Sequence, residues 1–273
     1  MFEFLRRNKK YCGSNDVTFV TGLFDIGRKS WGKYTRPISH YLDSLQSLID
    51  KELPMYVFCD ARHSNRLKIR NPSQTRLEPI GLEDLSLFRE ISRIESAIER
   101  NKEAWPRRAR KNNPEVVSGQ YILVTNSKLD LVDRACKDDH FGTSRFCWID
   151  AGIMGAKRIW TPILRPWTGQ IIDTDPNKVL WTQRVPIPES ASKHEIHEML
   201  NNGIWGGMFI GGKKASMQAA VLVRELLEEY LDEGIIDDDE GTTIALSMRH
   251  PDLVHLQMVS KSWEDCLRSL LKS

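Results

Sequence analysis

Three aspartates, Asp25, Asp60 and Asp150, each follow a short apolar run that is typical of a β-strand. The runs are VTGLF, MYVFC and FCWI, and Asp150 leads directly into the small-residue turn Ala151-Gly152. An unpaired carboxylate at a strand end is costly unless a cation or hydrogen-bond donors meet it. We therefore predict a ligand site there, with a hard divalent ion such as Mg²⁺ at Asp150. The alternative is that each carboxylate caps the turn that follows it.

A glycine-rich stretch, GIWGGMFIGGKK at 203–214, is the second candidate. Gly206 and Gly207 begin a short apolar strand that leads into a long helix, so the backbone here can turn sharply or lie against a bulky, flat ligand. The stretch does not match G-x-x-x-x-G-K-[ST], and the chain has no GxGxxG fingerprint. Neither a P-loop nor a dinucleotide-binding turn is therefore supported.

Four acids in a row stand at 237–240, immediately before the helical run GTTIAL. Acids at a helix start act as N-caps and favour the helix dipole, which explains one or two of them. Four exceed what capping needs. We predict that Asp239 or Glu240 faces a substrate hydroxyl as a general base or hydrogen-bond acceptor.

Two other motifs look like metal sites but fit less well. The Asp-x-Asp triplet at 173–175 lies in a polar turn before Pro176 and not at the end of an apolar strand. In HEIHE at 194–198, His194 and His197 are three residues apart, whereas the zinc motif H-E-x-x-H needs a spacing of four. We predict an exposed helix there, without a ligand role.

Apolar runs and helical spacing define the elements that must position these residues. Strands are predicted at 16–24, 55–60, 75–80, 146–150, 179–185, 205–212 and 253–259, and helices at 40–50, 82–100, 127–136 and 215–234. Their alternation predicts an α/β three-layer sandwich with a mostly parallel central sheet. Ligands bind such sheets beyond the carboxyl ends of the strands, where the three aspartates fall.

The chain has 273 residues, and we predict a single domain over 1–273 with an irregular insertion at 155–203 that is rich in Trp, Pro and His. Its 39 basic and 37 acidic residues give a net charge of +2, which does not favour nucleic acid as a partner. Basic clusters at 6–10 and 107–111 could contact anionic lipid, or could simply be solvated surface.

The five scattered cysteines include no C-x-x-C pair, which argues against disulfides and a thiolate zinc site. A reducing compartment fits this pattern best. The sequence shows neither a signal peptide nor an apolar run of membrane-spanning length. We therefore expect a cytoplasmic protein that could be peripheral to a membrane.

Five motifs together, in this order, resemble the HtrL/YibB-like family: TFVTGLFDIGR, SKLDLVDRAC, FCWIDAGI, GIWGGMFIGGKK and DDDEGTTIALSMRHPDLV. The resemblance covers the chain from about residue 17 to 258. The family is poorly characterised and is itself similar to glycosyltransferases of the GT-A fold. The resemblance implies a GT-A-like, Rossmann-like sandwich, with 155–203 on the acceptor side.

The resemblance also implies roles for individual residues. Asp150 would stand where GT-A enzymes carry an Asp-x-Asp metal motif for Mn²⁺ or Mg²⁺, although Gly152 occupies the second acidic position. Asp239 or Glu240 would lie near the reacting sugar. The residues implied to bind a UDP- or GDP-sugar donor are Thr21, Asp25, Arg28, Asp60, Lys128, Asp150, Gly152, Gly206 and Gly207.

The leading hypothesis is a nucleotide-sugar-dependent glycosyltransferase acting on a glycan or glycolipid acceptor, with a departing diphosphate stabilised by a metal ion and by Arg28 or Lys128. A second hypothesis is a metal-dependent phosphoesterase that uses Asp25, Asp60 and Asp150. A third is a non-catalytic module of the same fold that binds glycans through some of its eight tryptophans.

Overall fold

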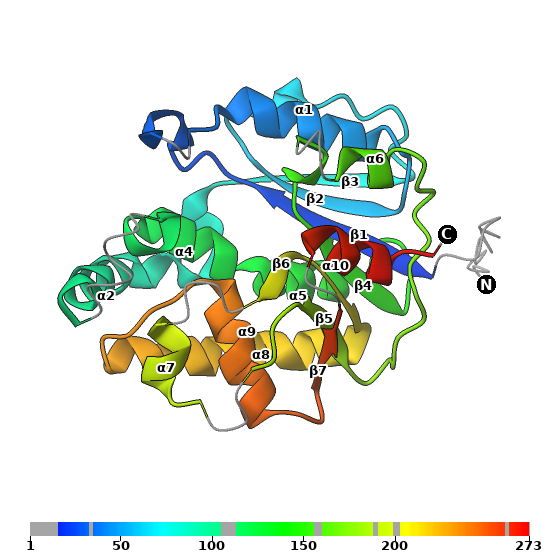
Figure 1. The fold of residues 1–273 in the computed structure, drawn as a ribbon. Coiled ribbons are helices and arrows are strands. Elements are labelled where there is room, and N and C mark those ends of the chain that lie inside the picture. The colour runs from blue at the N-terminus through cyan, green and yellow to red at the C-terminus, as the bar shows by residue number, and fades with distance from the viewer. Residues whose placement is uncertain are drawn as a thin grey trace, which may run out of the picture.

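The structure is a computed structural model that describes residues 16–32, 35–104, 113–155, 160–187, 191–198, 203–259 and 262–272. Within these residues, one seven-stranded sheet has the order β3-β2-β1-β4-β6-β5-β7 (Figure 1). The strands are β1 (Val17–Leu23), β2 (Met55–Asp60), β3 (Thr75–Ile80), β4 (Arg145–Ile149), β5 (Val179–Gln183), β6 (Ile204–Gly212) and β7 (Val254–Met258). Each predicted strand is present, with its ends shifted by at most two residues.

Strand β6 alone among the described strands runs against its neighbours. It pairs antiparallel with β4 and with β5, whereas the other pairings in the sheet are parallel. This confirms the predicted mostly parallel sheet. Because β6 is reversed, its first residues lie beside the last residues of β4, with Met208 opposite Ile149. Gly206 and Gly207 therefore come next to Asp150.

Helices cover both faces of the sheet, which confirms the three-layer α/β sandwich (Figure 1). The α-helices are α1 (Ile38–Ile49), α2 (Ile91–Ala104), α4 (Gly119–Asn126), α5 (Lys128–Asp138), α6 (Thr161–Leu164), α7 (Lys193–Glu198), α8 (Lys213–Asp232), α9 (Asp239–Arg249) and α10 (Trp263–Leu270). One hydrophobic cluster contains side chains of α1, α6 and α10, and a second contains side chains of α2, α4, α5, α7, α8 and α9.

Strand β4 shows why the apolar runs of this chain are continuous. Phe146 and Trp148 belong to one hydrophobic cluster, while Cys147 and Ile149 belong to the cluster on the other face of the sheet. Successive side chains of a strand point to opposite faces, so a strand covered on both faces must be apolar at every position. The run FCWI therefore places Asp150 at the first position where the chain leaves the core.

Outside the segment 155–203, three helices differ from the prediction. The predicted helix at 82–100 is broken at Leu85, whose backbone is extended, and its α-helical part, α2, begins only at Ile91. The Asp84 carboxylate accepts a hydrogen bond from the Gly81 backbone at 2.7 Å, a local contact that competes with helix formation. Helices α4 and α10 were not predicted; in α4 the apolar residues of GQYILVTN do not gather on one face, so the helical pattern is missing.

The segment 155–203, predicted as an irregular insertion, contains the strand predicted at 179–185, which is β5 of the sheet. Strand β5 pairs with β6 and β7, and α6 and α7 lie in the same segment. The basic clusters at 6–10 and 107–111 fall outside the described residues. In the part of the chain that the structure describes, no helix is long and apolar enough to cross a membrane.

Candidate functional site at the carboxyl ends of the parallel strands

A cleft of about 570 Å³ opens where β1 and β4 end and β6 begins. Its lining includes six of the residues predicted from sequence to bind a ligand: Asp25, Arg28, Lys128, Asp150, Gly152 and Gly207. The volume lies within the range of roughly 300–1,000 Å³ that is typical of small-molecule sites. The position at the carboxyl ends of the strands is where ligands bind in open α/β sheets.

Lys128 is the centre of the site. It is the first residue of α5, and its ammonium group donates to Asp239 Oδ2 at 2.7 Å and to the Gly206 carbonyl at 2.9 Å. It also lies 3.4 Å from Asp150 Oδ1. The three N–H donors of a lysine can thus all be used, one on each acceptor. Lys128, Asp150 and Asp239, hereafter the Lys128 cluster, bring together segments that are far apart in the chain.

The charges of the Lys128 cluster are strongly coupled. Burial by itself lowers the pKa of Lys128, but the carboxylates of Asp150 and Asp239 outweigh this effect, and the net pKa is raised. Lys128 is therefore charged at neutral pH. Burial raises the pKa of Asp239, an effect that the charge and hydrogen bond of Lys128 oppose. One ammonium group and two carboxylates leave one net negative charge when both acids are ionised.

Asp150 is held at the floor of the cleft by its neighbours. Its backbone N–H donates to the Gly207 carbonyl at 2.9 Å, and its Oδ1 accepts the indole N–H of Trp148 at 2.8 Å. The side chain is 43% exposed, and its Oδ2 has no hydrogen-bond partner among the described residues. Asp150 therefore presents one carboxylate oxygen to a ligand.

Five predicted site residues, Thr21, Asp60, Gly206, Asp239 and Glu240, do not line the cleft. Thr21 is fully buried within β1. Gly206 leaves space for the Lys128 cluster, because a Cβ at this position would lie 2.4 Å from Asp239 Oδ2. This glycine was predicted to approach a ligand, but the atoms it makes room for belong to the protein itself.

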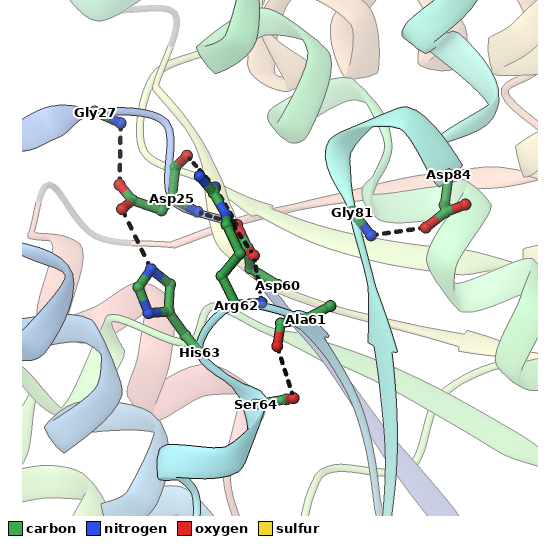
Figure 2. A network of polar contacts seen from close by, with 9 residues as sticks. All are labelled: Asp25, Gly27, Asp60, Ala61, Arg62, His63, Ser64, Gly81 and Asp84. Atoms are coloured by element: carbon green, nitrogen blue, oxygen red, sulfur yellow. Dashed lines mark hydrogen bonds and ion pairs between the residues drawn. The ribbon is translucent and has the colours of Figure 1, made fainter.

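Asp60 and Asp25 stabilise the loops beyond β1 and β2 (Figure 2). Arg62 binds both oxygens of the buried Asp60, at 2.5 Å from Nη2 and 2.9 Å from Nε. Burial raises the pKa of Asp60, but the contacts with Arg62 outweigh it and the net pKa is lowered. Asp25 accepts from the Gly27 backbone at 3.1 Å and contacts His63 Nε2 at 3.3 Å. This geometry therefore does not support the prediction that Asp60 binds the nucleotide-sugar donor.

The acidic run before α9 is divided between capping and the Lys128 cluster. Asp238 is the N-cap, and its side chain accepts from the Glu240 backbone at 3.0 Å, as predicted for one or two of these acids. Asp239 is held by Lys128. Burial, followed by the charges of Asp238 and Asp239, raises the pKa of Glu240 well above its ordinary value. Neither Asp239 nor Glu240 reaches the cleft lining, so their predicted role as base is not supported by this geometry.

Gly152 lines the cleft and also makes room for an aromatic side chain of the protein itself. A Cβ at this position would lie 2.8 and 2.9 Å from two carbons of the Tyr41 ring. The hydroxyl of Tyr41 accepts a hydrogen bond from Arg28 Nη1 at 2.5 Å. The glycine therefore allows Tyr41 to pack close to the turn after β4 and to hold Arg28 at the cleft.

We expect Gly152→Ala to lower the free energy of unfolding by about 1–3 kcal/mol, because the added methyl group would force the Tyr41 ring to move. Urea unfolding measures the change. In a Tyr41→Ala background the same substitution should cost much less, since the ring is absent. An equal cost in both backgrounds would contradict this account of Gly152.

Aromatic side chains form much of the remaining wall of the cleft. From the sequence, only some tryptophans were predicted to bind a ligand. Trp160 and Trp205 stack with ring centroids 5.1 Å apart, and both line the cleft with Trp148. Tyr41 and Tyr121 line it as well. The two stacked tryptophans are 45 residues apart in the numbering, so no local motif in the sequence could have paired them.

The donor set does not fit a resident divalent ion. Among the described residues, no three His, Cys, Asp or Glu side chains are placed to hold a metal. An ion bridging Asp150 and Asp239 would compete with the Lys128 ammonium, which already contacts both. At about 4 Å and an effective dielectric constant of about 20, a divalent ion and an ammonium group repel by roughly 8 kcal/mol. Asp150 is the carboxylate of the cluster that lines the cleft, and its Oδ2, which has no hydrogen-bond partner among the described residues, is the oxygen available to such an ion.

The two other motifs have structural roles. Asp173 pairs with Lys272 at 2.9 Å and with Arg145 at 3.5 Å, at the end of β4 opposite to the cleft. His197 lies in α7, as predicted for this segment, but it is fully buried and not exposed. Its Nε2 donates to the Ile236 carbonyl at 2.6 Å. Burial and this hydrogen bond account for His197 without a metal.

The fold and the cleft define an α/β protein with an open, mostly parallel sheet and a ligand-sized site at the carboxyl ends of its strands. The family profile described as "Bacterial protein of unknown function (HtrL_YibB)" matches residues 15–272, and the chain belongs to this family. Protein HtrL of Escherichia coli (strain K12) is 28% identical over 270 residues, which cover 93% of this chain and 92% of that protein. The resemblance noted from the motifs is confirmed.

Proposed function

We propose that this protein is a GT-A-like glycosyltransferase that transfers a sugar from a UDP- or GDP-sugar to a glycan or glycolipid acceptor. The observation that carries the proposal is the position of the Lys128 cluster beside the tryptophans of one cleft. Carboxylates accept hydrogen bonds from sugar hydroxyls, and flat aromatic faces suit the apolar face of a sugar ring. The cleft volume of about 570 Å³ suits a ligand of this size.

Sugar transfer requires both negative and positive groups in one site. The bond between the anomeric carbon and the phosphate oxygen breaks, and its electron pair leaves with the diphosphate. The oxygen of the acceptor hydroxyl bonds to the anomeric carbon and gives its proton to a carboxylate. We assign that proton to Asp150, which lines the cleft and keeps Oδ2 without a partner among the described residues. The net negative charge of the cluster also favours the positive charge that develops on the sugar.

The Mn²⁺ or Mg²⁺ predicted at Asp150 is not part of this proposal, because the donor set does not fit it. The same observation weakens the phosphoesterase hypothesis, in which Asp25, Asp60 and Asp150 share a metal. Asp60 is bound by Arg62, and Asp25 by Gly27 and His63. A glycan-binding module without catalysis rests on the stacked Trp160 and Trp205.

A panel of UDP- and GDP-sugars tests the proposal. A donor that binds the folded chain at 100 times its Kd should stabilise it by about 2.7 kcal/mol, which a thermal shift detects. Release of the nucleoside diphosphate in the presence of oligosaccharide or glycolipid acceptors then measures transfer. Binding of oligosaccharides with no binding of any nucleotide sugar would instead favour the non-catalytic module. Release of phosphate without transfer would favour the phosphoesterase.

A further inference from the structure

We infer that the cleft neutralises the diphosphate of its ligand with the guanidinium groups of Arg28 and Arg36, without a divalent metal ion. The inference rests on the proposed function and extends it to the binding of the leaving group. Both arginines line the cleft. Their backbones are adjacent, since the Arg36 N–H donates to the Arg28 carbonyl at 3.1 Å.

Neither of these two arginines has an acid partner among the described residues. Arg62, Arg93 and Arg249, by contrast, each bind a carboxylate. Arg28 is held instead by uncharged groups: Nη1 donates to the Tyr41 hydroxyl, and the guanidinium lies 5.3 Å from the centre of the Trp31 ring. Its Nη2 has no hydrogen-bond partner in the described part of the chain.

An arginine positioned by aromatic rings and left without a counter-ion is suited to an anion. The planar guanidinium can donate two parallel hydrogen bonds to phosphate oxygens, and such charge-assisted bonds are short and strong. Tyr41 restricts the Arg28 side chain before a ligand arrives, which lowers the entropy lost on binding. Two arginines supply the two positive charges that a divalent ion would otherwise bring to a diphosphate.

The charged residues of the cleft give it an electrostatic polarity. Arg28 and Arg36 belong to the segment that follows β1, whereas the Lys128 cluster, negative when both its acids are ionised, lies where β4 ends and β6 begins. Two further acids line the cleft: Asp25 is held by Gly27 and His63, and Glu115 accepts a hydrogen bond from Asn113. A sugar nucleotide has the matching polarity, with an anionic diphosphate beside a sugar that becomes positive as the bond breaks. Lys128 itself is engaged by Asp239, Gly206 and Asp150, so its N–H donors are already used within the protein.

Calorimetry with UDP and with GDP tests this inference, each in EDTA and in Mn²⁺. The variants are Arg36→Ala, Arg28→Ala and Arg28→Lys. The last variant keeps the positive charge but loses the planar guanidinium that can donate two parallel hydrogen bonds. Lys29→Ala is the matched control, because it removes one charge from the same exposed turn at a residue that does not line the cleft. We expect the Kd of the preferred diphosphate to differ less than twofold between EDTA and Mn²⁺. Each arginine variant should weaken it at least tenfold, and Lys29→Ala less than twofold.

The possible results separate this inference from the proposed function. Binding that is lost in EDTA and restored by Mn²⁺ would overturn the metal-free inference and leave the glycosyltransferase proposal standing. Arginine variants that bind like Lys29→Ala would also overturn it. If neither diphosphate nor any UDP- or GDP-sugar bound the unmodified chain in either condition, the inference and the proposed function would both fail. Arg36 is exposed, so Arg36→Ala remains informative even if Arg28→Ala does not fold.

Discussion

Lys128→Met should lower the free energy of unfolding by about 3–5 kcal/mol at pH 7, the cost of removing one partner of a buried ion pair. The substitution keeps the length of the side chain but leaves Asp239, which is 15% exposed, without its cation. It also leaves the Gly206 carbonyl without its lysine donor. Urea unfolding at pH 7 measures the loss.

The loss should shrink as the pH is lowered. Burial already raises the pKa of Asp239, and removing Lys128 removes the charge that opposes this effect. A carboxyl whose pKa is raised in the folded state destabilises the fold at high pH, and protonation relieves the penalty as the pH falls through that pKa. The difference between the variant and the unmodified chain should therefore be larger at pH 8 than at pH 5.

Two controls isolate the buried pair. Lys137 lies on the same helix and pairs with Asp133 at 2.7 Å, but its side chain is 60% exposed. Asp133 is buried, but it also lies 3.7 Å from Arg224 Nη1 and so keeps a cation, and Lys137→Met should cost less than about 1 kcal/mol. Adding Asp239→Asn to Lys128→Met should restore much of the lost stability, because the uncompensated charge is gone. A cost for Lys128→Met no larger than that for Lys137→Met would contradict the central role of Lys128.

Asp150→Asn should reduce turnover by about 10²–10⁴-fold, the usual contribution of a general base. Asparagine keeps an oxygen for the Trp148 indole but cannot take a proton. Because the side chain is 43% exposed, stability should fall by no more than about 1 kcal/mol. Affinity for the nucleoside diphosphate should stay within about threefold, since the phosphates are assigned to the arginines.

Steady-state transfer rates and calorimetry on the same preparations measure both effects. Asp173→Asn is the matched control, because it makes the same change at an exposed acid far from the cleft and should leave transfer unchanged. Full turnover by Asp150→Asn would remove Asp150 from the mechanism. Loss of diphosphate affinity that depends on Mn²⁺ would instead mark Asp150 as a metal ligand, as the sequence had suggested.

Local patterns were sufficient to predict the strands and the place of Asp150. Strands β2 and β4 are buried on both faces and therefore form apolar runs, and the run FCWI ends where the chain leaves the core. The rule that ligands bind at the carboxyl ends of parallel strands then placed the cleft. The family could be recognised because its motifs keep their order along the chain.

Contacts between distant segments could not be predicted in this way. Lys128 and Asp239 are separated by 111 residues, and neither local motif shows that they pair. Asp60 was expected to face a ligand because nothing before it in the strand neutralises it, yet Arg62 does so two residues later. The residues of the turn after a strand thus decide whether such a carboxylate is paired within the protein or faces a ligand.

The sequence by itself determined the α/β class, the strands of the sheet and the turn that carries Asp150, because these follow from the apolar pattern of short segments. The tertiary structure alone decided which charges meet. The reversed direction of β6 brings Gly206 and Gly207 beside Asp150, and the starts of α5 and α9 place Lys128 against Asp239. Such pairings depend on how distant elements pack, which no single segment encodes.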